Sequence, residues 1–483
     1  MKPLASSLML GLFALIAFFV PSLLYADRAQ PPAPIHPIPT ARQLAWHEKE
    51  YYAFVHFNTD TFLGVELGEG NEPPSVFNPS DTDVAGWVRL FRDAGMKGVV
   101  IVAKHHEGFC IWPSKLTDYT IAASPYKNGE GDIVREVAEA CRQNGLAFGF
   151  YLSPWDRNAP MFGETPKYNA FYLGQLRELL TNYGDSFHVW FDGAGTSTPG
   201  PSGGKQVYDW KSIHGLVREL QPKATMFSDA GPDVRWVGNE DGLASETNWC
   251  MIDSDRYFPG TPLYRELGEG KIDGKDWVPA EVDVSIRGGW FWHPDDEVKS
   301  LDHLLDIYYK SVGRNACLHL NVPPDRRGRI GDTEAERLLA MKRILDQTFV
   351  DNHAEGSTVT SEDVRRGGEV FSASRTVDGD TQTYWATDDG KSSGQFIVDL
   401  GDPTTFNVIM LQEYIALGQR IKAFTLEAME SGQWQTIASG TTVGYKRLLR
   451  LEENVTAEKV RVTVTDARAC PTISEFGLFT RPL

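Results

Sequence analysis

Short apolar runs alternate with longer amphipathic segments from about residue 45 to residue 350. The apolar runs predict strands at 52–57, 98–103, 147–152, 187–191, 224–228, near Leu243, and at 282–286 and 317–322. Between these runs, apolar residues recur at helical spacing, which predicts helices over 82–94, 133–143, 169–183, 208–220, 298–312 and 334–348. About eight strands that alternate with helices predict an α/β fold, an irregular (β/α)8 TIM-like barrel.

An open, doubly wound sheet is the alternative to this barrel. The dinucleotide-binding form of such a sheet carries the motif G-x-G-x-x-G directly after its first strand. No such motif follows residues 52–57, and the barrel is therefore favoured.

The pattern changes after residue 355, where helical periodicity fades and short strands separated by turns take over. These strands are predicted at 395–399, 406–412, 423–428, 433–438, 446–451 and 460–464. Closely spaced strands without intervening helices predict an all-β domain, an antiparallel β-sandwich over 358–483. Residues 351–357 form the predicted linker between this sandwich and a catalytic domain at 45–350.

The N-terminus has the features of a secretory signal. Lys2 is followed by an uncharged, largely apolar stretch over 8–24, and the small residue Ala26 precedes Asp27. This arrangement predicts a signal peptide over 1–26, with an N-terminal membrane anchor as the alternative. We therefore expect a secreted or periplasmic protein that does not insert into a membrane, with a proline-rich extended leader over 27–44.

The 483-residue chain carries a formal net charge of -18, which argues against nucleic acid and anionic membranes as partners. Its five cysteines are an odd number, and no two of them have the C-x-x-C spacing of common zinc or redox sites. We therefore expect neither a disulfide framework nor a zinc motif.

The run from Ser186 to Gly195 reads Ser-Phe-His-Val-Trp-Phe-Asp-Gly-Ala-Gly and is the most informative motif of the chain. Apolar residues lead up to a single carboxylate, Asp192, and a glycine follows it at once. In an α/β barrel such a strand end delivers an acid to the mouth of the pocket, where it serves as a nucleophile or a base. A helix-capping or turn aspartate is the structural alternative.

Other predicted strand ends also carry polar or aromatic side chains. They include His56, His105, His106, Tyr151, Asp229, Glu240, Trp290, Trp292 and Asn321. A barrel with only a structural role does not need such residues there, whereas enzymes with this fold collect their catalytic groups at the strand ends. The sequence therefore predicts one pocket lined by these side chains.

Metal binding is disfavoured in this pocket. Adjacent residues of a strand point to opposite faces, so we expect that His105 and His106 do not share one metal ion. No acidic third ligand stands at a metal-binding spacing from these histidines or from His56. Neutral imidazoles can instead hydrogen-bond to sugar hydroxyls, because each ring offers one donor and one acceptor.

A pair of carboxyl groups suits glycoside hydrolysis. One group must be ionised to attack or stabilise the anomeric carbon, and the other must be protonated to give its proton to the leaving oxygen. Asp192, near backbone amides and histidines, is the predicted ionised group. Glu240 is the predicted proton donor, because desolvation beside Trp236 and a loop would raise its pKa. The alternative candidates for the acid are Asp229, Glu246 and Glu66.

Five motifs of the chain resemble those of glycoside hydrolase family 29, the α-L-fucosidases, and most closely the branch that acts on α-1,3/1,4-linked fucose. The motifs are His56-Phe-Asn58, Lys104-His-His-Glu-Gly-Phe109, Val189-Trp-Phe-Asp-Gly193, Gly231-Pro-Asp-Val-Arg-Trp-Val-Gly-Asn-Glu240 and Val284-Ser-Ile-Arg-Gly-Gly-Trp-Phe291. The resemblance implies a retaining exo-hydrolase that removes fucose from Lewis-type oligosaccharides and glycoconjugates by double displacement. It implies no required cofactor.

The resemblance also implies roles for individual residues. Asp192 matches the nucleophile, and Glu240 matches the acid/base of this branch. The histidines among the remaining matches hold fucose hydroxyls, and the aromatic residues form the pocket wall against its C5 methyl group. These substrate-binding matches are His56, Glu66, His105, His106, Tyr151, Trp290 and Trp292.

Two positions depart from the family pattern. The usual motif has Asp where this chain has Glu107, and the longer acid is expected to alter the support of the neighbouring histidines. Members of this branch commonly have Glu-Trp-Gly where Glu66-Leu67-Gly68 stands, so an aromatic contact in the substrate pocket is replaced.

The C-terminal region resembles the discoidin or factor V/VIII type C sandwiches, which include carbohydrate-binding modules. The resemblance is carried by Val377-Asp-Gly-Asp-Thr-Gln-Thr-Tyr-Trp-Ala386 and Phe396-Ile-Val-Asp-Leu-Gly401. Such domains often hold a structural calcium ion, which we expect here near Asp378 and Asp380. The sandwich either binds glycan or only packs against the barrel.

The expected partner of the protein is a fucosylated oligosaccharide or a glycoprotein glycan. Two alternatives to an α-L-fucosidase stay open from the sequence. One is a secreted glycan-binding protein without catalytic activity, and the other is a glycosidase for a different sugar.

Overall fold

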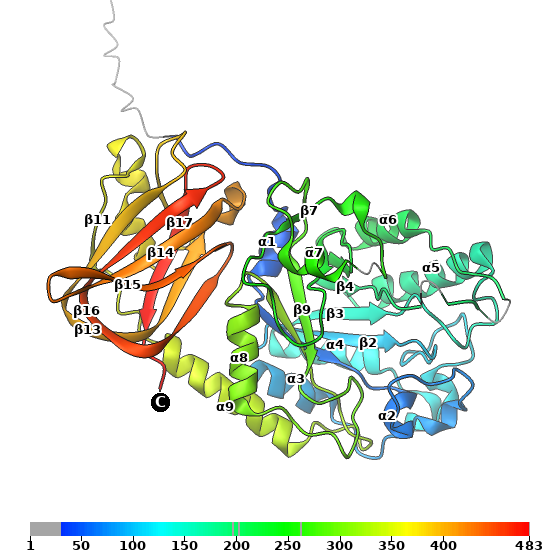
Figure 1. Cartoon of the computed structure of the whole chain (residues 1–483). Coiled ribbons are helices and arrows are strands. Elements are labelled where there is room, and N and C mark those ends of the chain that lie inside the picture. Colours follow the sequence, from blue (N-terminus) through cyan, green and yellow to red (C-terminus); the bar gives the residue numbers. More distant parts are fainter. Residues whose placement is uncertain (1–29, 196–197, 201–202, 261–262, 483) are drawn as a thin grey trace, which may run out of the picture.

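The computed structural model describes residues 30–195, 198–200, 203–260 and 263–482, which fold into a barrel and a β-sandwich that lie side by side (Figure 1). The expected combination of an α/β barrel and an all-β sandwich is confirmed. The signal peptide expected over 1–26 lies outside the described residues. Within the described ranges no helix has the length and apolar character needed to cross a membrane.

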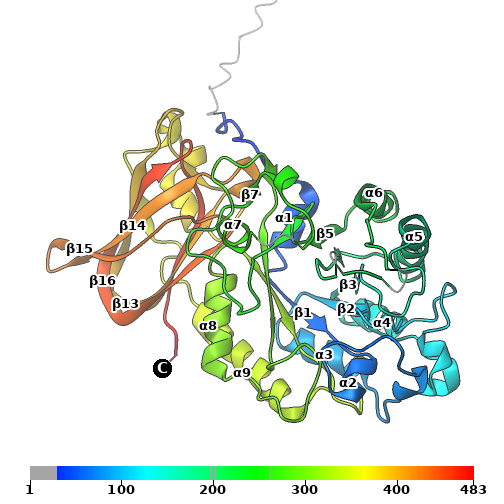
Figure 2. The ribbon, with the colours of Figure 1, turned by 45° about the vertical axis from the view of Figure 1, so that its right-hand side comes forward.

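Eight strands, all parallel to their neighbours, close the barrel. In order around the barrel they are β1 (Tyr51–Val55), β10 (Cys317–Asn321), β9 (Ala280–Ser285), β6 (Val234–Trp236), β5 (Thr225–Ser228), β4 (His188–Trp190), β3 (Ala147–Leu152) and β2 (Gly98–Lys104). The larger helices pack outside these strands (Figure 2) and are α3 (Val84–Asp93), α4 (Ile133–Asn144), α5 (Thr165–Asn182), α6 (Trp210–Leu220), α8 (Leu301–Ser311) and α9 (Asp332–Phe349). Because all strands are parallel, the segments that follow them meet at one end of the barrel.

The sixth barrel position departs from the expected pattern. The strand predicted near Leu243 is wrong: β6 occupies this position, and Leu243 lies in the loop after it. β6 has three residues, which is too short for alternation to be visible in the sequence. An insertion between β6 and β9 holds the small sheet of β7 (Met251–Ile252) and β8 (Asp276–Trp277) and the short helix α7 (Tyr264–Glu269).

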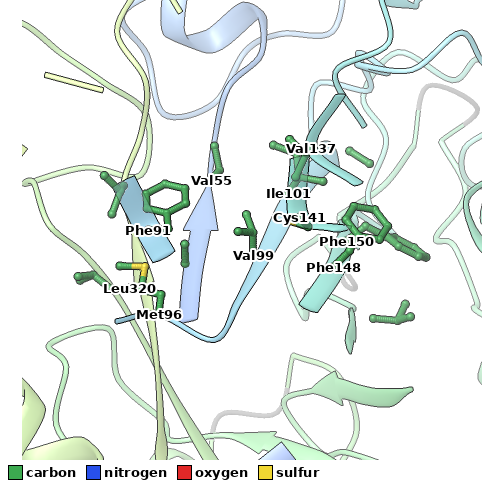
Figure 3. Packing of buried hydrophobic residues seen from close by; sticks show 14 of the residues in the cluster. Val55, Phe91, Met96, Val99, Ile101, Val137, Cys141, Phe148, Phe150 and Leu320 are labelled. Carbon is green, nitrogen blue, oxygen red and sulfur yellow. The ribbon is translucent and has the colours of Figure 1, made fainter. Parts of the chain in front are cut away.

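Alternate positions on the strands separate two parts of the barrel core. On β2, Val99 and Ile101 belong to the apolar layer shared with the helices, whereas Val100 and Val102 belong to the cluster inside the barrel. Figure 3 shows Ile101 beside Val137 of α4. Full burial of such an aliphatic side chain contributes about 1.5–3 kcal/mol, so this layer holds the helices on the strands.

The inside of the barrel also contains a charged network. Glu281 of β9 is buried, and its carboxylate accepts a hydrogen bond from Trp190 Nε1 at 2.8 Å. The same carboxylate lies 3.0 Å from His188 Nε2 and 3.1 Å from His319 Nδ1. Although burial opposes ionisation, His188 and His319 hold the pKa of Glu281 well below its usual value. This network fixes Trp190, whose ring contributes to the pocket described below.

The sandwich is built from antiparallel strands. Their order is β12 (Trp385–Ala386), β17 (Thr472–Phe479), β13 (Gly394–Glu413), β16 (Arg447–Ala467), β14 (Ile421–Glu430) and β15 (Gln433–Gly440), and β11 (Thr358–Thr360) pairs with β13. The strands predicted at 395–399 and 406–412 are two halves of β13, separated by a register shift. The prediction missed β17, in which the polar residues Ser474 and Glu475 are adjacent and interrupt the alternation of polar and apolar positions.

The N-terminal leader is not extended throughout, as was expected for 27–44. Helix α1 (Ala41–His47) begins within it, and Thr40 and Gln43 form a capping box at its start. The preceding residues lie along the sandwich, where Ile35 N donates to the carbonyl of Leu417 at 2.9 Å. The leader therefore links the two domains, in addition to the segment over 350–357 between α9 and β11.

Candidate active site

A pocket of about 350 Å³ opens at the carboxyl ends of the barrel strands. Most of the side chains expected in a common site line it, namely His56, Glu66, His105, His106, Tyr151, Asp192, Glu240 and Trp290. They follow different strands: His56 stands just after β1, His105 just after β2 and Asp192 just after β4. The closed barrel thus brings together residues that are far apart in the sequence.

Asp192 presents its carboxylate to the pocket and is oriented through both oxygens. Oδ2 accepts a hydrogen bond from the Tyr151 hydroxyl at 2.9 Å, and Oδ1 accepts one from the backbone N–H of Ala194 at 2.7 Å. The next residue must be glycine, because a Cβ at Gly193 would lie 2.5 Å from the backbone nitrogen of Gly260 and 2.2 Å from Asp229 Oδ2. The Asp-Gly pair seen in the sequence is therefore explained by crowding at the pocket wall.

Glu240 lies at the rim of the same pocket, in the loop after β6. The residue is exposed, but partial desolvation by the surrounding pocket wall raises the pKa of its carboxyl group, and the nearby charge of Asp192 raises it further. A hydrogen bond from the Trp290 indole opposes this shift only in part. The two expected catalytic acids therefore share one pocket, and Glu240 keeps its proton to a higher pH than an ordinary glutamate.

His56 and His106 are held as neutral hydrogen-bond acceptors. His56 Nδ1 lies 2.8 Å from Asn321 Oδ1, and His106 Nδ1 lies 2.7 Å from Oγ of Ser153, whose hydroxyl donates to a backbone carbonyl. Each Nδ1 therefore carries the proton, and Nε2 keeps a lone pair. Burial, followed by the positive charge of His105, lowers the pKa of both rings well below its usual value.

His105 has the opposite character. Its Nδ1 lies 3.8 Å from Asp60 Oδ2 and 3.6 Å from Glu107 Oε2, and all three side chains are buried. Burial disfavours the charged imidazole, but the two carboxylates outweigh it and raise the pKa of His105 to about 9. Burial, followed by the charge of Asp60, raises the pKa of Glu107 to about 7. His105 is therefore a cation at neutral pH. Its imidazolium can donate a hydrogen bond in the pocket, whereas His56 and His106 each offer an acceptor.

Two expectations about these histidines are wrong. His105 and His106 do not point to opposite faces, because β2 ends at Lys104 and both residues lie in the turn after it, with ring centroids 4.0 Å apart. Acidic partners do stand at His105, since Asp60 and Glu107 bring carboxylate oxygens close enough to share a cation with it. The proton on His105 supplies a positive charge at that point.

Asp229, one of the alternative acids, also lines the pocket. Burial, followed by the charge of Asp192, raises its pKa to about 7. Its Oδ2 accepts a hydrogen bond from the backbone N–H of Gly260 at 2.6 Å, so the carboxylate holds the segment that crosses this side of the pocket.

The other two alternative acids have structural partners. Glu66 accepts a hydrogen bond from the backbone N–H of Trp290 at 2.8 Å and so fixes the turn that carries this ring. Glu246 pairs with Arg314 at 3.0 Å and stands at the boundary with the sandwich. Glu246 is therefore excluded as the acid, and Glu66 is a positioning group of the pocket wall.

Trp292 does not join the pocket wall as expected. Its ring packs against the guanidinium groups of Arg287 and Arg326, which lie 5.7 Å and 5.9 Å from the ring centroid. The strand β9 ends at Ser285, so the two-residue alternation that would place Trp290 and Trp292 on one side does not extend to them.

Sequence reasoning missed several residues of the site, among them Asp60, Asp283 and Phe291. Asp283 of β9 lines the pocket, and burial, followed by the charge of Glu240, raises its pKa well above its usual value. The alternation of Glu281, Asp283 and Ser285 with small apolar residues was a usable signal for inward-facing positions. Phe291 was also missed, although its ring centroid lies 5.2 Å from that of His56. No pattern in the sequence distinguishes it from the neighbouring tryptophans.

The departure from the family pattern at Leu67 lies in the pocket itself. Leu67 lines it, and its side chain is 39% exposed. An aliphatic side chain therefore stands at this side of the rim, where the family pattern predicts an indole.

Comparison with known proteins agrees with this geometry. A family model described as Alpha-L-fucosidase matches residues 29–348, and one described as F5/8 type C domain matches residues 357–476. The similarity to α-L-fucosidases and to type C domains expected from the sequence motifs is thereby confirmed.

Relatives of known sequence or structure cover almost the whole chain. Alpha-L-fucosidase 1 of Arabidopsis thaliana is 42% identical over 453 residues, which cover 93% of this chain and 88% of that protein. The crystal structure of SpGH29 is similar at a TM-score of 0.89 and 37% identity, covering 94% of this chain and 100% of that one. A GH29 fucosidase of Ruminococcus gnavus in complex with fucose has a TM-score of 0.86 and 35% identity, over 94% and 97% of the two chains. The chain therefore belongs to glycoside hydrolase family 29: it is an α-L-fucosidase with an F5/8 type C domain after its catalytic barrel.

Proposed function

We propose that the enzyme cleaves α-1,3/1,4-linked L-fucose from Lewis-type oligosaccharides and glycoconjugates with retention of configuration. In the first displacement a carboxylate oxygen of Asp192 attacks the anomeric carbon, and the bond to the leaving oxygen breaks as Glu240 gives that oxygen a proton. In the second, Glu240 takes a proton from water, whose oxygen attacks the anomeric carbon and frees Asp192. The observation that carries the proposal is that both carboxyl groups line one pocket and that the pKa of Glu240 is raised.

Proton NMR of the first sugar released tests the stereochemistry. Two displacements at one carbon restore its configuration, so α-L-fucose is the expected first product and the β anomer follows only by mutarotation. Initial release of the β anomer would show a single displacement and would contradict a covalent role for Asp192.

The assignment of the acid is tested by variants of the two competing carboxyl groups. Glu240 is favoured because it lies at the rim, where the leaving group departs, whereas the Asp229 carboxylate is engaged by Gly260. Glu240→Ala should lose most activity on natural glycans. On an aryl fucoside, whose leaving group needs no proton, azide should raise the activity of this variant by attacking the fucosyl enzyme without base assistance. Asp229→Asn is the control and should gain nothing from azide. The reverse pattern would assign the acid to Asp229.

The preference for α-1,3/1,4 linkages is supported by two features. The motif that ends at Glu240 resembles that of the α-1,3/1,4 branch, and aromatic side chains stand at the rim of the pocket. Tyr264 is 53% exposed, and its ring packs edge-on against that of Trp236, with centroids 5.5 Å apart. Such aromatic groups suit contact with the sugar rings of a branched aglycone. Lewis a and Lewis x substrates should be hydrolysed faster than 2'-fucosyl substrates, and the opposite order would contradict the preference.

For the sandwich we propose a structural calcium ion near Asp378 and Asp380, beside the buried Glu475, whereas the barrel needs no cofactor. Glu475 is 5% exposed, and its buried Oε1 has no hydrogen-bond partner among the described residues. Burial, followed by the charges of Asp378, Glu355 and Asp380, raises the pKa of Glu475 to about 7. Carboxylate oxygens of this kind suit Ca²⁺. Chelation should lower the melting temperature of the enzyme but not that of Glu475→Gln, and an equal response of both would contradict the site.

We propose that the protein is exported and acts on fucosylated oligosaccharides or glycoprotein glycans outside the cytoplasm. This proposal is supported by the order of features over 1–26, where a charged residue is followed by an apolar stretch and then by a small residue. Fractionation of producing cells should find processed protein in the periplasm or medium, and unprocessed protein in the cytoplasm would contradict export.

A further inference from the structure

The loop over 237–250 carries Glu240 and joins β6 to β7. It contains no helix or strand, so its conformation depends on the contacts of its side chains and backbone. The first half of the loop reaches the pocket, and the second half, from Ala244 to Cys250, lies between the barrel and the sandwich. The sandwich side chains that bond to it are Gln419, Thr441, Thr442 and Arg447.

Glu246 is held from both domains. Its carboxylate pairs with Arg314 of the barrel, at 3.0 Å between Nη2 and Oε2, and with Arg447 at the start of β16. Arg447 also donates from Nη1 to the backbone carbonyl of Glu246 at 2.9 Å, and its side chain is 2% exposed. Because a buried guanidinium bonds to both the carboxylate and the carbonyl of one residue, this part of the loop has little freedom to move.

The following residues bond to the sandwich through their backbone. Asn248 N donates to Thr442 Oγ1 at 2.9 Å, and the Asn248 carbonyl accepts a hydrogen bond from Gln419 Nε2 at 3.0 Å. Cys250 N donates to Gln419 Oε1 at 2.7 Å. A buried irregular segment must satisfy such backbone groups, and here the sandwich supplies the partners.

A compact turn links this anchored half to Glu240. Asn239 Nδ2 donates to the carbonyl of Leu243 at 2.9 Å, and Asn239 Oδ1 accepts a hydrogen bond from Asp241 N at 3.1 Å. The turn also packs tightly on α8, since a Cβ at Gly242 would lie 2.8 Å from Ile307. Because the turn is compact, the position of Glu240 depends on where the anchored half of the loop is held. The barrel contributes to this anchoring at Ala244, whose N–H donates to the carbonyl of Lys310 at 2.8 Å and whose carbonyl accepts a hydrogen bond from Arg314 Nη1 at 2.9 Å.

We propose that the sandwich positions the proton donor: Arg447, Thr442 and Gln419 hold the loop over 237–250 so that Glu240 reaches the leaving oxygen. Proton transfer requires the donor within about 2.6–3.2 Å of the oxygen, so a small displacement of the loop removes it. Arg447, Thr442 and Gln419 are positioning residues and do not touch the substrate. The inference rests on the proposed role of Glu240.

Point variants of the full-length enzyme test this role. Arg447→Met and Thr442→Val each remove one anchor while keeping the volume of the side chain. Arg450→Met is the matched control, because Arg450 also lies in β16 and crosses the same domain boundary but pairs with Asp306 of α8. Thermal unfolding of each variant serves as the control that it is folded. We would measure kcat/KM on the Lewis a trisaccharide, whose sugar leaving group needs a proton, and on 4-nitrophenyl α-L-fucoside, whose phenolate does not.

Both anchor variants should lose about tenfold or more on the trisaccharide, a part of the about 10²–10⁴-fold that general acid catalysis contributes, and less than about threefold on the aryl fucoside. The control variant should change neither value. Equal losses on both substrates, which a merely structural effect would cause, or no loss on either, would overturn the inference. Glu240→Ala provides the reference. If Glu240→Ala loses kcat/KM equally on the trisaccharide and the aryl fucoside, the proposed acid is wrong. If Glu240→Ala loses more on the trisaccharide and the anchor variants do not, only the positioning inference fails.

Discussion

Replacement of Glu107 by glutamine tests the protonation states assigned to the three histidines of the pocket, with His105 charged and His56 and His106 neutral. The change removes one of the two carboxylates that lie beside His105 Nδ1 and keeps an oxygen to accept the hydrogen bond of Asn58 Nδ2. With a pKa of about 9, His105 is mostly protonated at pH 8. With the ordinary imidazole value of about 6.5, it would be mostly neutral at that pH.

The size of the effect follows from the hydrogen bond at stake. A bond from a charged donor is worth about 1.5–3 kcal/mol, or about 10- to 150-fold in binding. Since Asp60 remains beside the ring, we expect L-fucose to inhibit Glu107→Gln about tenfold more weakly than the wild type at pH 8. Because the pKa of His105 is raised in the folded enzyme, the donor is fully present at low pH and is lost as the pH rises through about 9. At pH 5.5 the two enzymes should therefore differ little.

The inhibition constant of L-fucose, measured across this pH range with an aryl fucoside as reporter, gives the result. Nitrogen-15 NMR of the imidazoles reports the protonation of His105 directly. Glu107→Asp keeps the negative charge, so it should keep the wild-type pH dependence. If Glu107→Gln and the wild type lose affinity over the same pH range, the pair of carboxylates does not hold the proton on His105 and the reasoning is refuted.

Four further substitutions have defined outcomes. Asp192→Ala should abolish turnover and leave thermal unfolding close to that of the wild type, because the side chain is only half-buried; measurable turnover would contradict its role. Tyr151→Phe removes the hydroxyl that donates to Asp192 Oδ2 and should lower kcat/KM about tenfold, as expected for loss of a bond worth about 1.5 kcal/mol to a charged group; an unchanged value would show that the bond does not aid the reaction. Trp290→Ala should raise KM for aryl fucosides whereas Trp292→Ala should not, since only Trp290 lines the pocket; equal effects would contradict this placement.

The fold could be predicted from the sequence wherever an element is long enough to show its period. The strand predicted at 147–152 has the observed bounds of β3, and the helix predicted at 133–143 differs from α4 by one residue. The short strand β6 was missed, because three residues show no alternation, and the halves of β13 were separated because the strand is irregular between them. These errors arise because the periodicity of apolar residues is a local signal, which a very short or irregular strand does not show.

The site was predictable where a residue stands at a strand end in a distinctive run. Asp192 directly follows the largely apolar run 187–191, and the structure places it in the pocket. Asp60 was not predictable, because only the closed barrel brings α2 (Thr59–Leu63) against His105. The orientation of Trp292 was also beyond reach, since it depends on the path of a turn and not on a repeating backbone.

The covalent intermediate expected on Asp192 is the most direct test of double displacement in this pocket. A 2-deoxy-2-fluoro-fucosyl fluoride should react with the nucleophile and be released slowly, so that peptide mass spectrometry finds the sugar attached to Asp192. Attachment to Asp229 or Glu240 would assign the nucleophile elsewhere. Turnover of this reagent without any labelled peptide, together with release of the inverted anomer, would contradict a covalent mechanism altogether.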